Sequence, residues 1–204
     1  MSHFDNKARE WDNNPVFQDR ADKIAAAIRA EVRLTSGMRA LDYGCGTGLL
    51  SFPLQAELGH ITLKDSSAGM LEVLREKIAA RGVTNMLARQ ADLTAEPLPE
   101  ERYDLIYSAM TLHHIPDTAH ILQVFHALLN PGGQLCIADL DREDGGFHGP
   151  GFDVHHGFER ADLAGLAGQA GFGRIRFRTV FEIVKQQENG ERAYPVFLMT
   201  AERA

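Results

Sequence analysis

The sequence predicts an α/β domain of three layers, built on a seven-stranded, mainly parallel sheet whose last strand is antiparallel. Expected strands and helices alternate along most of the chain, which is typical of a parallel sheet covered by helices on both faces. A glycine-rich turn joins the first expected strand to the helix that follows it. The last two expected strands are joined by a polar turn too short for a crossover helix, so they should be antiparallel.

Apolar runs bounded by turn residues mark the strands. We expect the strands at residues 38–43, 60–64, 84–90, 103–107, 134–140, 173–184 and 194–201. Apolar side chains at helical spacing mark the helices. We expect the helices at residues 18–32, from the glycine turn to about 58, around 71–78 with a stop near Gly82, around 121–129 with a stop at Pro131-Gly132-Gly133, and at 159–170. Residues 141–157 are rich in glycine, histidine and aspartate and predict a loop.

The composition is that of an ordinary globular domain. Of the 204 residues, 44% are hydrophobic and 24% are charged, which suits one domain with a sizeable core. We expect a single domain over residues 1–204. Its parts are an N-terminal helix and lid at 1–32, a core at 38–140, a loop at 141–158, and a C-terminal helix and hairpin at 159–204.

Charge and cysteine content limit the partners and the compartment. The net charge of −7 argues against an electrostatic grip on nucleic acid, which needs a basic face. Cys45 and Cys136 are the two cysteines, and their positions do not indicate a disulfide framework, so a reducing compartment fits. Because the chain shows neither a membrane-spanning apolar run nor a signal-peptide pattern, we expect a cytoplasmic protein.

The glycine turn selects the kind of cofactor. Asp42 ends the first expected strand, and Gly44, Gly46 and Gly48 follow it in the order G-x-G-x-G. A pyrophosphate cofactor favours G-x-G-x-x-G and no nearby carboxylate. The Asp42 carboxylate suits an ammonium group better than a phosphate, and the glycines let the backbone approach a ligand closely. S-adenosylmethionine has an ammonium, a carboxylate and a cationic sulfonium, and no phosphate.

This turn resembles motif I of the class I S-adenosylmethionine-dependent methyltransferases. Further blocks resemble successive motifs of that family in its order and spacing. They are Asp65-Ser66 with Met70 after the second strand, Asp92-Leu93 after the third, Ser108 in the fourth, His113-His114 in the loop after it, and Asn130-Pro131-Gly132-Gly133 before the fifth. The resemblance covers residues 38–140 and implies a Rossmann-like fold with S-adenosylmethionine as cofactor. Lys64 departs from it, because the family usually has an apolar residue there.

The resemblance also implies which residues hold each part of the cofactor. The methionine part would contact Asp42, Gly44, Cys45, Gly46 and Gly48. The ribose would contact Asp65, Ser66 and Met70, and the adenine would contact Asp92 and Leu93. The methyl group would lie over the fourth strand at Ser108.

Two segments are candidates to cover this site. Residues 4–12 resemble the N-terminal segment of methyltransferases related to the ubiquinone and menaquinone biosynthesis enzymes, which implies that Trp11 folds over the methyl donor and contacts both cofactor and acceptor. The alternative is a helix start whose tryptophan covers the edge of the core. The second segment is the loop after the fifth strand, where His148, His155 and His156 are candidate acceptor contacts.

Histidines supply the candidate catalytic groups. Imidazole titrates near neutrality, so His113 or His114 can act as a base or orient the acceptor, and His114 is also a candidate acceptor contact. We expect no metal site, because the histidines lack a recognised ligand spacing. A site that combines them with Asp139 or Asp141 is the alternative.

The sequence therefore predicts an S-adenosylmethionine-dependent methyltransferase that moves a methyl group to a small-molecule acceptor by in-line displacement. Two alternatives stay open. One is a regulatory or partner protein that binds S-adenosylmethionine without turnover, since one fold hosts both. The other is an NAD(P)-dependent oxidoreductase, which fits the strand, turn and helix but neither Asp42 nor the glycine order. The acceptor, its reacting atom and the oligomeric state also stay open.

Overall fold

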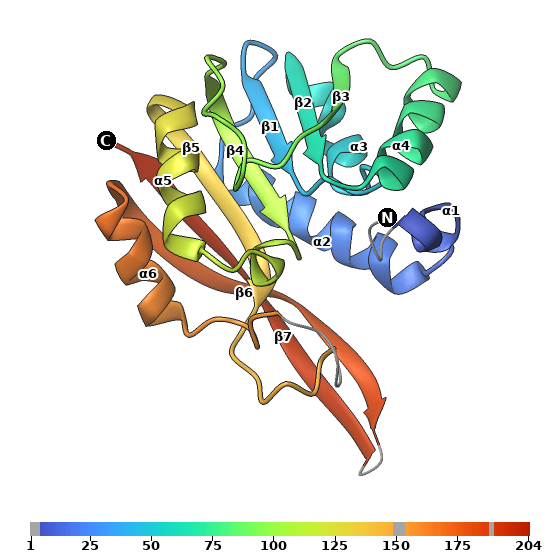
Figure 1. Cartoon of the computed structure of the whole chain (residues 1–204), viewed down its shortest axis with the longest axis vertical. Coiled ribbons are helices and arrows are strands. Elements are labelled where there is room, and N and C mark those ends of the chain that lie inside the picture. Colours follow the sequence, from blue (N-terminus) through green and yellow to red (C-terminus); the bar gives the residue numbers. More distant parts are fainter. Residues whose placement is uncertain (1–4, 149–153, 188–189) are drawn as a thin grey trace.

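The computed structural model describes residues 5–148, 154–187 and 190–204. Its centre is a seven-stranded sheet in the order β3-β2-β1-β4-β5-β7-β6 (Figure 1). In chain order the strands are β1 Arg39–Tyr43, β2 His60–Asp65, β3 Met86–Gln90, β4 Tyr103–Ala109, β5 Leu129–Leu140, β6 Phe172–Gln187 and β7 Gly190–Arg203. Strands β1 to β5 pair in parallel, and β7 is antiparallel to both β5 and β6. The predicted fold class is confirmed.

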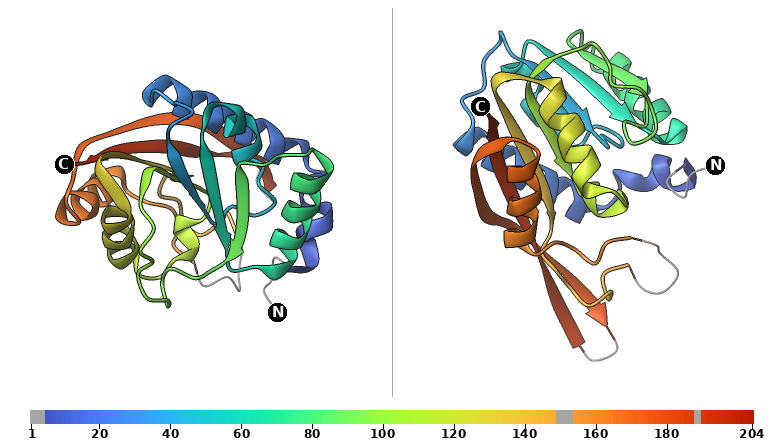
Figure 2. Two further views of the ribbon diagram at one scale, coloured as in Figure 1. Left: turned by 90° about the horizontal axis from the view of Figure 1, so that it is seen from above. Right: turned by 60° about the vertical axis from the view of Figure 1, so that its left-hand side comes forward.

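Helices cover both faces of the sheet. They are α1 Ala8–Trp11, α2 Pro15–Glu31, α3 Ser51–Leu54, α4 Ala68–Ala80, α5 Thr118–Leu128 and α6 Arg160–Gln169, with 3-10 turns η1 Asp5–Lys7, η2 Gln55–Glu57 and η3 Leu112–His114. One buried cluster packs α2, α3 and α4 against one face, and a second packs α5 and α6 against the other. Figure 2 shows α2 and α3 on the opposite side of the sheet from α5 and α6. The parallel strands β1, β2, β4 and β5 are therefore mostly buried on both faces, as expected for this arrangement, whereas the edge strand β3 is mostly exposed or half-buried.

The helix after the glycine turn is shorter than expected. The turn occupies the chain as far as Leu50, so only the four residues Ser51–Leu54 form α3 before the 3-10 turn Gln55–Glu57. Leu58 is then extended and ends the helical segment. The helical segment therefore ends close to the expected residue 58, but it starts late because the turn occupies the residues before Ser51, and its second half is a 3-10 turn.

The boundary between α5 and β5 also differs from the expectation. Helix α5 ends at Leu128, and Leu129 is already extended at the start of β5. The expected stop at Pro131 was therefore too late. Asn130 precedes a proline, and this position disfavours helical backbone. Strand β5 pairs with β4 at Leu129 and resumes regular pairing at Gln134 after a register shift.

Two further features bear on the site. Lys64, the departure from the family pattern, is buried in β2, and its Nζ lies 3.6 Å from a carboxylate oxygen of Glu101. The hairpin of β6 and β7 extends beyond the rest of the sheet, with the loop after β5 beside it (Figures 1 and 2). Within the described ranges, every helix is too short or too polar to cross a bilayer.

Candidate functional site

A cavity of about 680 Å³ lies where β1, β2 and β4 end. The carboxyl ends of these parallel strands point towards the segment that carries α1 and α2 (Figure 1). Open α/β sheets bind ligands at this edge. The sequence-predicted site residues that line the cavity are Trp11, Asp42, Gly44, Cys45, Gly46, Asp65, Ser66, Met70, Asp92, His113, His114 and His148. The predicted residues outside its lining are Gly48, Leu93, Ser108, His155 and His156.

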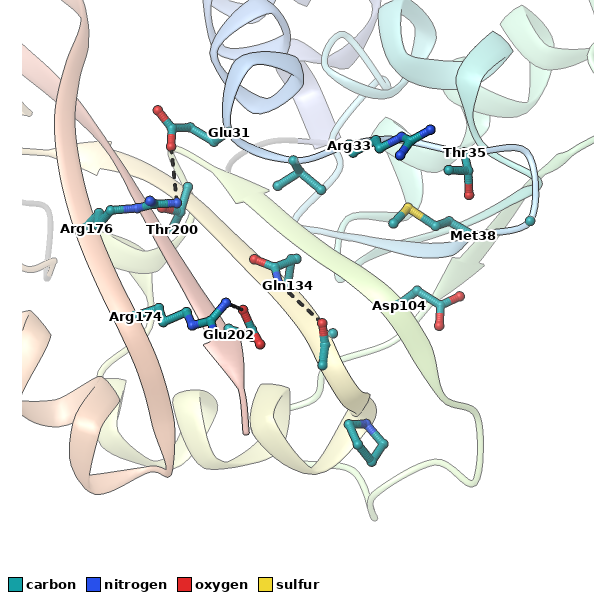
Figure 3. A pocket seen from close by; sticks show the side chains of 15 residues that line it. Glu31, Arg33, Thr35, Met38, Asp104, Gln134, Arg174, Arg176, Thr200 and Glu202 are labelled. Atoms are coloured by element: carbon teal, nitrogen blue, oxygen red, sulfur yellow. Dashed lines mark hydrogen bonds and ion pairs between the residues drawn. The ribbon is translucent and has the colours of Figure 1, made fainter.

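A second hollow of about 630 Å³ lies at the opposite, amino end of the strands (Figure 3). Two ion pairs lie in it: Arg176 lies 3.5 Å from Glu31, and Arg174 lies 3.2 Å from Glu202. This end of an open α/β sheet is not where ligands bind. The cavity at the carboxyl ends is therefore the candidate site.

The glycine turn forms the floor of the cavity. Gly44 and Gly46 both have left-handed backbone, with φ of 71° and 52°, which glycine adopts without steric cost. A Cβ on Gly46 would meet no atom within 4 Å, so this glycine faces open space. A Cβ on Gly44 would lie 2.2 Å from the Thr111 hydroxyl. Gly46 thus lets a ligand approach the backbone, whereas Gly44 lets η3 approach the turn.

Asp65 connects β2 to the glycine turn. One of its carboxylate oxygens accepts a hydrogen bond from the Gly46 N–H at 2.7 Å, and the other accepts from the Ser67 N–H at 2.8 Å. Burial raises the pKa of Asp65, and these donors oppose the rise. Each carboxylate oxygen has a second lone pair, so Asp65 can still accept hydrogen bonds from a ligand in the cavity.

Asp42 is the most deeply buried acid of the cavity, at 2% exposure. The Ser51 hydroxyl donates to it at 2.6 Å and also lies 2.6 Å from the Tyr107 hydroxyl. Burial raises the pKa of Asp42 to about 7. A cation bound beside Asp42 would favour its ionised form, because an opposite charge offsets the cost of burial.

The N-terminal segment closes one side of the cavity. Trp11 lines it and packs on Phe17, with ring centroids 4.6 Å apart. Asp12 accepts a hydrogen bond from the Thr47 hydroxyl of the glycine turn and pairs with Lys77 of α4. The sequence did not indicate this link, because Asp12 and Lys77 are far apart along the chain. The structure describes this segment from Asp5 onward, so Phe4 of the predicted motif lies outside the described residues.

Gly48, Leu93 and Ser108 lie outside the cavity lining and contribute to the packing around it. A Cβ on Gly48 would lie 2.7 Å from Leu74, so this glycine lets the turn approach α4. Leu93 is buried in the core cluster beneath α5. The Ser108 hydroxyl donates to the Tyr43 carbonyl at 2.7 Å and ties β4 to β1. Cys45 is buried, and burial raises the pKa of its thiol, which keeps it in the neutral form.

His113 lines the other end of the cavity, and the buried Asp139 lies behind it. The His113 Nδ1 lies 2.6 Å from an oxygen of Asp139, and both side chains are at most 1% exposed. Asp139 also accepts from the Leu140 N–H at 2.7 Å. Burial opposes ionisation of Asp139, but His113 and the backbone donors outweigh it and lower the pKa of Asp139. Because the ionised carboxylate only accepts, Nδ1 carries the proton and Nε2 is left to face other groups.

Two more histidines surround the His113 ring. The His114 and His148 ring centroids lie 4.2 Å and 5.0 Å from that of His113. Burial, together with the charges of His113 and Lys185, lowers the pKa of His148 to about 4. His155 contacts backbone carbonyls instead of the cavity. Its backbone N–H donates to the His113 carbonyl at 2.8 Å, and its ring Nε2 lies 2.9 Å from the Ile115 carbonyl oxygen.

His156 is exposed and lies against Gly145. Of the loop over residues 145–158, the stretch 149–153 lies outside the described residues. Within the described part of that loop, His148 is the histidine that reaches the cavity.

The sequence reasoning missed three cationic side chains that line the cavity, Lys7, Arg20 and Lys185, and the last two lie near the histidines. Arg20 of α2 lines it, and burial lowers its pKa to about 10 against the opposing charge of Asp139. Lys185 of β6 also lines it, donates to the Phe147 carbonyl at 2.6 Å, and stands 3.7 Å from the Phe147 ring centroid. Neither residue belongs to a motif, so only the packing of α2 and the hairpin revealed them. Arg20 and Lys185 place two positive charges near the histidine end of the cavity, and Asp139 places one negative charge there.

The methyltransferase domain family matches residues 34–161. The chain belongs to this family. The match spans the glycine turn, Asp65, Asp92 and all three clustered histidines. Trp11, Arg20 and Lys185 lie outside it, on the segments that flank the matched region.

The chain is similar in sequence to curated methyltransferases whose names refer to menaquinone and ubiquinone. The chain is 32% identical over 114 residues to demethylmenaquinone methyltransferase of Listeria monocytogenes serotype 4a, which is 54% of this chain and 48% of that protein. It is 37% identical over 132 residues to a ubiquinone biosynthesis O-methyltransferase of Xylella fastidiosa strain M23, 63% of this chain and 49% of that protein. The chain thus spans about half the length of these relatives.

Solved structures share the fold over nearly the whole chain. A Haloferax volcanii putative methyltransferase, solved with the Trm112 methyltransferase activator, matches with a TM-score of 0.79 and 17% identity, covering 100% of this chain and 98% of that one. An S-adenosylmethionine-dependent methyltransferase of Aquifex aeolicus matches with a TM-score of 0.67 and 21% identity, covering 88% and 89%. At these identities the likeness establishes the fold.

Proposed function

We propose that this protein is an S-adenosylmethionine-dependent methyltransferase that acts on a small-molecule acceptor. The observation that carries the proposal is the pairing of two acids at one open glycine: Asp65 holds the Gly46 N–H, and buried Asp42 lies beside the same turn. Family membership and the names of the curated relatives support it. The net charge of −7 supports a small molecule over nucleic acid as acceptor.

The residues present fit this cofactor. Asp42 would hold the ammonium, Gly46 would let the methionine part reach the backbone, Asp65 would accept the ribose hydroxyls, and Asp92 would meet the adenine. A pyrophosphate at the turn would instead face the Asp42 carboxylate, which disfavours a nicotinamide cofactor. The cavity of about 680 Å³ falls within the range of small-molecule sites and leaves room for an acceptor.

The protein's part in the reaction is positioning and proton removal. S-adenosylmethionine supplies an electrophilic methyl group on its sulfonium when bound. Trp11 covers the cavity from the N-terminal side and offers an aromatic face to a cation. His113, oriented by Asp139, or neighbouring His114 would take a proton from the acceptor. Arg20 and Lys185 favour an acceptor that carries or develops negative charge.

Calorimetric titration with S-adenosylhomocysteine, with NADH as the matched control, tests the proposal. Micromolar binding of the first and none of the second is the expected result. NADH binding in place of S-adenosylhomocysteine would overturn it in favour of an oxidoreductase. Turnover is then followed as S-adenosylhomocysteine release over a panel of phenols, hydroquinones, amines and thiols. Tight cofactor binding with no release from any of them would favour the regulatory alternative.

The affinity for S-adenosylhomocysteine is expected to rise with pH and to level off above about 7. The pKa of Asp42 is about 7 in the free protein, so its carboxyl is largely protonated at lower pH. The ligand ammonium needs the ionised form, and binding therefore releases a proton, which changes affinity by about tenfold per pH unit below that pKa. The change is measured by titration across roughly two units either side of neutrality.

Asp42→Asn is the control for this pH dependence. It keeps the shape of the side chain and removes the titrating group. We therefore expect a lower affinity for S-adenosylhomocysteine that depends less steeply on pH. Asp65, whose pKa burial also raises, is still present in the variant, and the difference between the two proteins isolates Asp42. An equally steep pH dependence in the variant would contradict the assignment of the ammonium to Asp42.

A further inference from the structure

We propose that His113, His114 and His148 together bind one divalent transition-metal ion, with Zn²⁺ as the expected occupant. The inference that an ion binds depends only on the three imidazoles. The part that the ion would play in activating an acceptor depends on the proposed function.

The three side chains converge from two separate segments. His113 and His114 are neighbours in η3, and His148 comes from the loop after β5. One ring nitrogen from each lies within 4.8 Å of the other two. A tetrahedral Zn²⁺ with Zn–N bonds of about 2.0–2.1 Å holds its ligand atoms about 3.4 Å apart. Small rotations of the rings would close the cluster to that spacing.

His113 is already held in the way a metal ligand requires. Its Nδ1 donates to Asp139 at 2.6 Å, which fixes the ring and leaves the Nε2 lone pair available. That Nε2 is buried and has no hydrogen-bond partner among the described residues. A buried polar atom without a partner is costly, and a bound ion would supply one. A carboxylate behind a ligating histidine is the usual second layer of a zinc site.

The chemistry of the donors selects the ion. Three neutral imidazoles suit zinc, copper, nickel or cobalt rather than magnesium or calcium, which prefer oxygen. Three protein ligands leave one tetrahedral position open, as in catalytic zinc sites. All three histidines line the cavity, so that position would face the acceptor.

The ion would give the acceptor an alternative to a protein base. A Lewis acid bound to an acceptor hydroxyl or thiol lowers the pKa of that group, so the group would lose its proton to solvent water and become the nucleophile without His113 taking the proton. Arg20 and Lys185 lie at the same end of the cavity, and their positive charges oppose the binding of a metal cation there. Asp139 offsets part of that charge, and an anionic acceptor would offset the rest. Acceptor and ion should therefore bind more tightly together than apart.

The test uses the full chain without a polyhistidine tag, stripped with a chelator and titrated with Zn²⁺ alone by calorimetry. We expect one ion per chain. His148→Ala and His114→Ala should each weaken binding by at least about 100-fold, and Asp139→Asn by about 10–100-fold, because outer carboxylates of this kind contribute that much. His120→Ala is the matched control: His120 is exposed on α5 and should change nothing. Co²⁺ in place of Zn²⁺ should give the visible absorption of a tetrahedral site.

Absence of binding to the stripped protein would overturn the proposal, as would equal affinity in wild type and His148→Ala. The same preparations are titrated with S-adenosylhomocysteine, which separates this proposal from the proposed function. Cofactor binding without Zn²⁺ binding would remove the metal site and keep the methyltransferase. Zn²⁺ binding without cofactor binding would do the reverse.

Discussion

Asp139→Asn is expected to reduce turnover by about 10²–10⁴-fold, the range over which a positioned acid–base group contributes. The affinity for S-adenosylhomocysteine should stay nearly unchanged, because Asp139 lies behind His113 and outside the cavity lining. The asparagine amide can donate to Nδ1 of His113, which moves the imidazole proton to Nε2. The Nε2 lone pair is then lost, whether it serves as a base or as a metal ligand.

This prediction has two readouts. Turnover is measured with the acceptor that the screen identifies. The tautomer of His113 is read from its ring ¹⁵N chemical shifts, which need no acceptor. Asp139 is fully buried and accepts from two backbone N–H groups as well as from His113, so thermal unfolding is recorded on the same samples. Asp144→Asn is the control, because Asp144 is an exposed acid in the loop after β5.

An equal loss of turnover and of cofactor binding would make Asp139 a structural residue. An unchanged tautomer with full turnover would contradict its role in orienting His113. The expected loss of turnover requires that Asp139 is ionised in the wild type. Burial raises the pKa of Asp139, but His113 and the backbone donors lower it by more, so the ionised form is favoured.

Asp65→Ala is expected to weaken S-adenosylhomocysteine binding by about 1–3 kcal/mol, roughly 5- to 150-fold, the cost of losing hydrogen bonds to a charged group. The carboxylate would accept the ribose hydroxyls and already holds the Gly46 and Ser67 N–H groups. Its removal therefore acts both on the ligand and on the turn. Calorimetric titration measures the change.

Two further variants separate these effects. Asp65→Asn keeps an acceptor oxygen of the same size and should fall between wild type and Asp65→Ala. Asp22→Ala, an exposed acid on α2, should bind as wild type does. Wild-type affinity in Asp65→Ala would show that the cofactor does not lie in the assigned register along β2.

The local features of the site were predictable because they depend on backbone geometry and strand order. Left-handed φ at Gly44 and Gly46 requires glycine, so the turn is visible as a motif. Asp42 and Asp65 end parallel strands that pair with each other, which brings both acids to one edge of the sheet. The same motif logic assigned ligand contacts to Leu93 and Ser108, which the structure places in the core and in a bond between strands.

The positions of helix ends were less predictable. Periodicity shows where an apolar stripe lies, but not where the chain changes direction. Leu50 still belongs to the turn, and Leu129 already belongs to β5, because pairing with β4 outweighs local helical preference there. Both differences concern where a helix starts or stops, and both leave the strand order intact.

The sequence by itself determined the order of strands and helices, the glycine turn, the two acids beside it and the family. These follow from local conformational preference and from the period of apolar residues, which are written in consecutive positions. Only the tertiary structure decided that His148 joins His113 and His114, that Asp139 stands behind them, and that Arg20 and Lys185 enter the same cavity. Those contacts join α2, η3, β5 and β6, and they form only when the sheet and its terminal hairpin are packed.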